Sequence, residues 1–153
     1  GRFDRERAED LGVPPGPKFS TLHEGEAVEL ADGTVVEPEE VVGPSRPGRC
    51  VVYTGDTRPT DAVVEAAADA DLLIHDATFT AAERGRAQST GHATAREAGQ
   101  VAARAGVRRL ALVHLSSRYA GDHTPIEREA REAFDGEVWV PDDGEDLDVP
   151  FPE

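Results

Sequence analysis

Leu72-Leu73-Ile74-His75-Asp76 is an apolar run that ends on a histidine and a carboxylate. The same pattern occurs before it at residues 51–56, where a Gly-Asp pair ends the run, and after it at residues 110–114, where a histidine does. Short apolar runs bounded by turn residues are typical of buried strands. Polar groups at strand ends are where metal and phosphate sites tend to form. The spacing therefore predicts strands whose ends carry the chemistry of this protein.

Helices are expected between these strands. The apolar spacing of Ala95, Ala98, Val101 and Ala102 predicts a helix over residues 93–105. Alternating strands and helices imply an α/β layer, with mixed strand directions at its start. The predicted order is strand 50–54, helix 60–69, strand 71–75, helix 93–105, strand 109–114, helix 124–133 and strand 137–141.

The first third of the chain predicts smaller elements. Residues 4–11 read as a short helix, and Pro-Pro-Gly-Pro at 14–17 as a rigid loop. Asp32-Gly33 lies between two short strand-like segments, which is a hairpin signal. Residues 38–49 are rich in Pro, Gly and charge and predict a surface connection, while the acidic tail from residue 142 is expected to be solvated.

Composition limits the possible classes of protein. A length of 153 residues suits one domain, and no apolar run approaches the roughly 18 residues that span a bilayer. The single cysteine, Cys50, fits a reducing cytoplasm. The net charge of −15, with Lys18 as the only lysine, would repel nucleic acid in dilute buffer. We favour adaptation to a salty cytoplasm instead, where screening confines electrostatics to about 3 Å and leaves an RNA substrate possible.

Two residues at strand ends could bind metal. Gly55 lets the chain turn so that the Asp56 carboxylate is free to bridge cations, although Asp after Gly is more often a turn former or a helix cap. His114 follows four apolar residues and is either a ligand or a buried structural histidine. The following segment, 116–119, carries two hydroxyls, a guanidinium and a phenol. It predicts a phosphate clamp or, alternatively, a helix N-cap with a surface arginine.

His92 precedes a predicted helix in a Gly-His-Ala-Thr turn. A neighbouring carboxylate would favour the imidazolium that protonates a leaving oxygen, and Asp76 is the candidate partner. His75 is expected to face the interior. His23 and His123 are in polar contexts and are expected at the surface.

These motifs, in this order, resemble ribonuclease Z, the family of endonucleases that remove 3′ trailers from precursor tRNA. The match spans nearly the whole chain, and the acidic, lysine-poor composition would suit a member from a halophilic archaeon. The matching segments are residues 12–17, 25–26, 30–33, Tyr53-Thr-Gly-Asp-Thr-Arg58, Leu73-Ile-His-Asp-Ala-Thr-Phe79, Gly91-His-Ala-Thr94 and Leu112-Val-His-Leu-Ser-Ser-Arg-Tyr119.

The resemblance implies a two-metal site. Asp56 matches the carboxylate that bridges two zinc ions, and His114 matches a terminal imidazole ligand. Two such ions generate hydroxide near neutral pH and stabilise both oxygens of an in-line displacement.

The resemblance also implies catalytic and substrate-binding residues. His92 matches the catalytic histidine and Asp76 its carboxylate partner. The family more often has Glu at this position, so the shorter Asp76 predicts a contact that is lengthened or bridged by water. Ser117, Arg118 and Tyr119 match contacts to tRNA phosphates near the cleavage point.

The first half of the family carries a His-x-His-x-Asp-His cluster and a further histidine ligand, and neither occurs in this sequence. Two protein ligands rarely hold catalytic zinc, which typically has three plus water. We therefore expect residues 1–153 to be a single half-domain, the C-terminal half of a metallo-β-lactamase-type αββα sandwich, inactive alone. The missing N-terminal half would carry the remaining zinc ligands. The predicted parts are a loop and hairpin region at 1–49, alternating strands and helices at 50–141, and an acidic tail at 142–153.

The leading hypothesis is a zinc-dependent endoribonuclease that leaves a 3′-hydroxyl on the tRNA and acts in the cytoplasm as a homodimer. Two other functions stay open. One is a related phosphodiesterase of the same fold that acts on small cyclic or nucleotide substrates. The other is a stand-alone domain retained for binding or dimerisation. The Pro-rich loop and residues 117–119 favour the tRNA enzyme, and the joint presence of Asp56, His92 and His114 favours an enzyme over a remnant.

Overall fold

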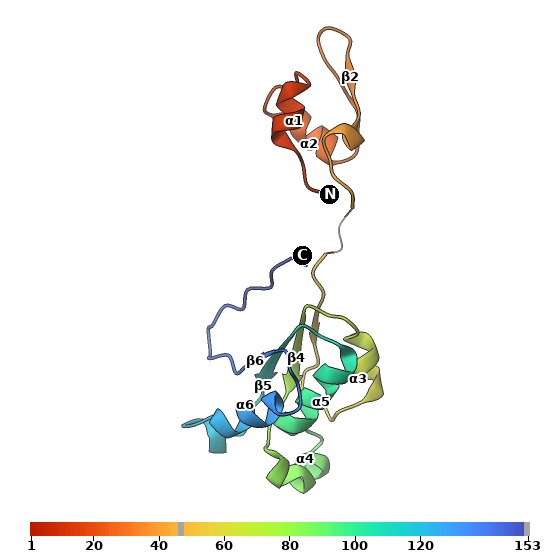
Figure 1. Ribbon diagram of the computed structural model, residues 1–153. Helices are drawn as coiled ribbons and strands as arrows, with labels where there is room; N and C mark the ends of the chain where they lie inside the picture. Colours follow the sequence, from red (N-terminus) through yellow and green to blue (C-terminus); the bar gives the residue numbers. More distant parts are fainter. Residues whose placement is uncertain (46–47, 152–153) are drawn as a thin grey trace. The chain divides into compact units, whose positions relative to one another are not determined.

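The structure, a computed structural model, describes residues 1–45 and 48–151. The chain divides into two compact units, Gly1–Pro47 and Gly48–Glu153, and both appear in Figure 1. Each unit has its own hydrophobic core. Within the described residues, every helix is too short or too polar to cross a lipid bilayer.

The first unit is a small packed body of short elements. Its core consists of Ala8, Val13, Leu22, Val28, Val36 and Val41. The predicted helix and hairpin are confirmed, and the two strands of the hairpin are antiparallel. Its elements are α1 (Arg5–Asp10), α2 (Pro17–His23), β1 (Val28–Glu29), β2 (Val35–Val36) and the 3-10 turn η1 (Pro38–Glu40).

Helix α2 was not predicted from the sequence. The sequence pattern conceals this helix because proline usually indicates a break in a helix. Pro17 stands at the first helical position, where the N–H that proline lacks would have no partner within the helix. Gly16, with φ 142°, turns the chain into it, a conformation that glycine adopts without strain. Leu22 is fully buried and fastens the helix to the core of the unit.

The second unit is built on a four-stranded sheet. The strands β3 (Val51–Tyr53), β4 (Leu72–Asp76), β5 (Arg109–Val113) and β6 (Glu137–Trp139) pair in that order, and every pair is parallel. The predicted α/β class is therefore confirmed. Mixed strand directions were expected at the start of this α/β layer. Among the named strands, the antiparallel pair is instead the β1–β2 hairpin of the first unit.

The connections between strands contain the helices. They are α3 (Asp61–Ala66), η2 (Ala81–Glu83), α4 (Arg84–Thr90), α5 (Ala95–Ala105), η3 (Ser117–Tyr119) and α6 (Thr124–Arg131). Helix α4 was missed because its sequence is polar throughout and only Ala87 is buried. Without apolar periodicity, a short surface helix leaves no sequence signal.

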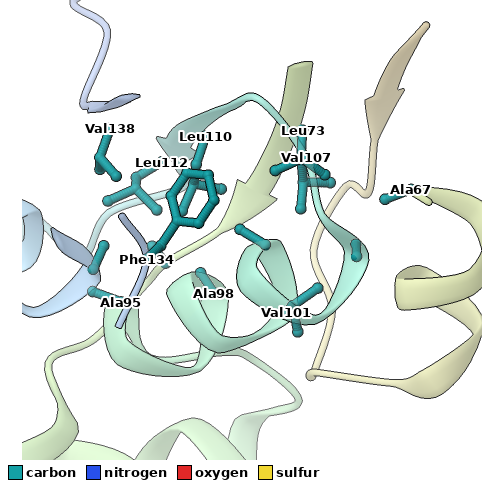
Figure 2. Packing of buried hydrophobic residues seen from close by; sticks show 14 of the residues in the cluster. Ala67, Leu73, Ala95, Ala98, Val101, Val107, Leu110, Leu112, Phe134 and Val138 are labelled. Atoms are coloured by element: carbon teal, nitrogen blue, oxygen red, sulfur yellow. The ribbon is translucent and has the colours of Figure 1, made fainter. Parts of the chain in front are cut away.

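The main core lies between the sheet and helices α5 and α6 (Figure 2). Leu73, Leu110 and Leu112 come from the strands and meet small residues of α5 such as Ala98. Gly99 lets the two helices approach closely, because a Cβ there would lie 2.7 Å from the carbonyl oxygen of Ala130.

The opposite face of the sheet is partly uncovered in this unit. Val52 packs toward the core, so Val51 and Tyr53, which alternate with it, point to the other side. Val51 is 49% exposed and Tyr53 is 68% exposed. Large apolar side chains left open on a sheet face are typical of a surface that another element covers.

Parallel strands bring their carboxyl ends to one edge. Asp56 follows β3, Asp76 ends β4, and His114 follows β5. Backbone hydrogen bonds tie the loops after β4 and β5 together, from Ser116 N to Thr78 O at 3.0 Å and from Ala77 N to Val113 O at 3.0 Å. Ligand sites of open α/β sheets form at this edge.

Candidate metal and catalytic site

Asp76 is the most completely hydrogen-bonded side chain of the site. Its Oδ1 accepts from Thr78 N at 2.9 Å and from Thr78 Oγ1 at 2.8 Å. Its Oδ2 accepts from Thr57 N at 3.1 Å and contacts His92 Nδ1 at 2.7 Å. The residue is fully buried. Burial would raise the pKa of the carboxyl, but the hydrogen bonds from His92, Thr78 and Thr57 outweigh it and hold this pKa below its ordinary value.

His92 lies directly against this carboxylate. The expectation of a lengthened or water-bridged contact is therefore wrong, because the loop after Gly91 brings the ring close enough to compensate for the missing methylene. Gly91 has φ 81° and ends α4, and Thr94 caps α5 two residues after the histidine. With Nδ1–H donating to Asp76, Nε2 is the ring nitrogen left for a substrate.

His114 is held in an unusual backbone conformation. Its φ of 60° is in the left-handed region, which a non-glycine residue adopts only where its surroundings impose it. Its Nδ1 lies 2.9 Å from Thr78 Oγ1, and its Nε2 lies 3.4 Å from Asp56 Oδ2. The ring stacks on that of His92, with 4.8 Å between centroids and 22° between planes. The strained backbone thus places this imidazole between the His92–Asp76 pair and Asp56.

Asp56 and His114 fit a metal ion. Two ligands of tetrahedral zinc, each about 2.0 Å from the ion, are about 3.3 Å apart, close to the separation of Asp56 Oδ2 and His114 Nε2. Both side chains are about half exposed. Within the described residues, His114 is the only ion-pair partner of Asp56, so this carboxylate keeps its lone pairs for a cation.

A second grouping of possible ligands consists of Asp76, His92 and His114, whose ligand atoms lie within 4.8 Å of one another. We favour the Asp56–His114 pair as the metal position. Both oxygens of Asp76 are already occupied by donors, and a metal there would have to displace the 2.7 Å contact to His92.

The predicted substrate-binding residues are beside this edge, on η3. Ser117 is exposed and begins the turn. Arg118 is paired with Glu83, and the phenol of Tyr119 donates to Glu83 Oε2 at 2.6 Å and accepts from Thr80 N at 3.2 Å. A single carboxylate from η2, that of Glu83, therefore contacts both Arg118 and Tyr119. A cavity of about 770 Å³ opens beside them and is lined by His114, Ser117, Tyr119, His123 and residues of the acidic tail.

The other histidines are mostly where the sequence placed them. His75 is fully buried, and burial lowers its pKa even though its Nδ1 contacts the carbonyl of Asp76 at 2.7 Å. His23 is exposed. His123 was expected at the surface but is half-buried, because the loop after η3 folds it into the wall of the cavity.

Sequence reasoning missed three residues that hold the site together. Thr57 and Thr78 donate to Asp76, and Glu83 holds Arg118 and Tyr119. Thr78 stands two residues after Asp76, which is the signal that could have found it, since such threonines often bond locally. Thr57 donates through its backbone N–H to Asp76, 19 residues away, and has no such signal. Glu83 is 35 residues from Arg118 and carries no such signal.

A family model, the beta-lactamase superfamily domain, matches residues 19–115. The chain belongs to the beta-lactamase superfamily. Within that superfamily, the expected resemblance to ribonuclease Z is confirmed. The chain is 69% identical to "Ribonuclease Z" of Natronomonas pharaonis over all 153 of its residues, which cover 50% of that protein. It is 52% identical to "Ribonuclease Z" of Myxococcus xanthus over 151 residues, 49% of that protein.

Solved structures of the superfamily share the fold. Human tRNase Z, short form, has a TM-score of 0.53 at 29% identity and matches 76% of this chain and 37% of its own. A metallo-β-lactamase fold protein of Bacillus subtilis has a TM-score of 0.55 at 37% identity and matches 60% of this chain and 36% of its own. The metallo-β-lactamase fold is thus confirmed. The chain spans about half the length of the curated relatives it matches.

Proposed function

We propose that this chain carries part of the active site of a zinc-dependent endoribonuclease that removes 3′ trailers from precursor tRNA and leaves a 3′-hydroxyl on the tRNA. The observation that carries the proposal is the 2.7 Å contact between His92 and Asp76 beside the Asp56–His114 pair, at one sheet edge of a chain so similar to ribonuclease Z. An acid catalyst next to a metal position suits phosphodiester hydrolysis, because one group can protonate the leaving oxygen while metal supplies the nucleophile.

His92 is the proposed general acid. The Asp76 carboxylate fixes the ring through Nδ1, which leaves Nε2 to deliver a proton to the leaving oxygen of the scissile phosphodiester. Only 19% of the His92 side chain is exposed, which limits competing proton exchange with water.

Asp56 and His114 are the proposed zinc ligands on this side of the site, in which two ions are expected. Bound zinc would supply a hydroxide nucleophile at neutral pH and stabilise the charge of an in-line displacement. Ser117, Arg118 and Tyr119 are the proposed contacts to tRNA phosphates. Glu83 pre-orients the guanidinium and the phenol, so less side-chain freedom is lost on binding.

An N-terminal half is proposed to complete the site. Asp56 and His114 are fewer protein ligands than catalytic zinc usually has, and the exposed Val51 and Tyr53 offer a sheet face for a second layer. We propose that the chain is inactive without that half and that the complete enzyme acts in the cytoplasm of a halophile as a homodimer.

The proposal is tested on the complete polypeptide in which this sequence occurs, with a radiolabelled precursor tRNA and zinc. Asp56→Ala and His114→Ala should each abolish detectable cleavage, whereas His23→Ala, a histidine of the other unit, should leave the rate within about twofold. Full activity of His114→Ala would refute the metal role. Cleavage of small phosphodiesters without any cleavage of precursor tRNA would refute the proposed substrate.

A further inference from the structure

Thr78 lies between the two parts of the site. Its side chain is almost fully buried, and its hydroxyl contacts both Asp76 Oδ1 at 2.8 Å and His114 Nδ1 at 2.9 Å. Asp76 contacts His92, and His114 faces Asp56. One hydroxyl therefore touches a member of the proposed acid pair and a member of the proposed metal pair.

The hydroxyl of Thr78 has a single proton, and the direction of that proton sets the tautomer of His114. The Asp76 carboxylate accepts from the backbone N–H groups of Thr57 and Thr78, and as an ionised group it offers acceptor oxygens only. The single hydroxyl proton of Thr78 must then be directed to Asp76 Oδ1. The oxygen is left as an acceptor toward His114, and Nδ1 of that ring must donate.

A ring that donates through Nδ1 in its neutral form has a free lone pair on Nε2. In His114 this lone pair points to Asp56 Oδ2, 3.4 Å away. The two facing atoms are then both acceptors. Such a pair is unfavourable alone and favourable around a cation.

We propose that Thr78 is a positioning residue that selects the Nδ1–H tautomer of His114 and thereby presents Nε2 and Asp56 together to a metal ion. This inference rests on the proposed function, since it concerns the same metal position. The backbone supports it: Ser116 N donates to Thr78 O at 3.0 Å, which brings the threonine to the strained turn at His114. Hydrogen-bond partners of ligating histidines typically contribute 10- to 100-fold in metal affinity.

The first test is a direct measurement of the tautomer without metal. The complete polypeptide, labelled with ¹⁵N-histidine and stripped of zinc, is studied by NMR above the pH at which His114 is protonated. The His114 signals are assigned by their loss in His114→Ala. We expect the proton on Nδ1. A proton on Nε2 in the wild type would overturn the inference, whatever any variant does.

The second test compares two replacements of Thr78. Thr78→Val keeps the shape but removes the hydroxyl, and we expect it to weaken zinc binding by 10- to 100-fold in competition with a chromogenic chelator. Thr78→Ser restores the hydroxyl and should return the affinity to within about threefold of wild type. Thr90→Val, at an exposed threonine of α4, controls for the loss of a hydroxyl elsewhere.

The outcomes separate this inference from the proposed function. If the wild type binds zinc and cleaves precursor tRNA but Thr78→Val binds zinc equally well, only the role of Thr78 is overturned. If the wild type neither binds zinc nor cleaves precursor tRNA, the proposed function itself is overturned. Should Thr78→Val fail to fold, the tautomer measurement on the wild type still decides.

Discussion

Asp76 and Asp56 are the same residue type at the ends of neighbouring parallel strands, yet their surroundings are opposite. Asp76 is fully buried and receives hydrogen bonds on both oxygens, whereas the Asp56 side chain is 58% exposed and faces the imidazole of His114. One carboxylate is satisfied by the protein alone. The other keeps its lone pairs free. Hydrogen-bond supply, more than residue type, therefore separates a carboxylate that the protein satisfies from one that is free to bind a cation.

Metal removal, which acts at the exposed carboxylate Asp56, should affect activity most. Removing metal from the complete polypeptide with a chelator should abolish cleavage of precursor tRNA, and added zinc should restore it, because two ions are proposed to supply the nucleophile. Far-UV circular dichroism should change little on chelation, as a control that the loss of cleavage is not a loss of secondary structure. Undiminished cleavage after metal removal would contradict the proposed metal role of Asp56.

Substitution of the buried carboxylate, Asp76, should have the next largest effect on activity. Asp76→Asn keeps the shape but places an amide against His92, so the ring loses the carboxylate that holds its Nδ1–H. We expect cleavage to slow by about 10²- to 10⁴-fold, as for loss of a general acid, with zinc affinity within about threefold of wild type. A matched loss of zinc binding would instead place Asp76 among the metal ligands.

For the free energy of unfolding, the buried Asp76 should matter more than the exposed Asp56. Asp76→Ala leaves the backbone N–H of Thr57 and the hydroxyl of Thr78 without their acceptor, and we expect the free energy of unfolding to fall by about 1–3 kcal/mol. Asp56→Ala removes an exposed group and should change it by less than about 0.5 kcal/mol without metal. Urea unfolding of the metal-free polypeptide measures both, and equal effects would contradict the difference in burial.

The smallest effect is a dependence of stability on pH. The pKa of Asp76 is lower in the folded protein than in the unfolded chain, because hydrogen bonds from its neighbours outweigh its burial. The stabilisation is therefore complete above the unfolded pKa of about 3.9 and is lost as the pH falls toward the folded value. Asp76→Asn should flatten the loss of stability below about pH 4 in urea titrations, and Asp56→Asn is the matched control. An unchanged profile would contradict the lowered pKa.

The fold was predictable wherever local pattern and tertiary packing agree. Helix α5 has an apolar stripe and a Thr94–Glu97 capping box, and both its position and its buried face are as expected. Helix α2 begins at a proline and buries only Leu22, and helix α4 buries only Ala87. Neither helix has the apolar periodicity from which a helix is predicted.

The amino-acid sequence alone was enough to predict the alternation of strands and helices, the edge at which the strands end, and the residue types collected there. These follow from apolar periodicity and from the rule that parallel strands end together. Tertiary packing sets which groups touch. His92 contacts the shorter Asp76 directly, Thr78 joins Asp76 to His114, and Glu83 holds Arg118. Hydrogen bonds depend on distances of a few tenths of an ångström between segments far apart in the chain, and only the packed fold sets such distances.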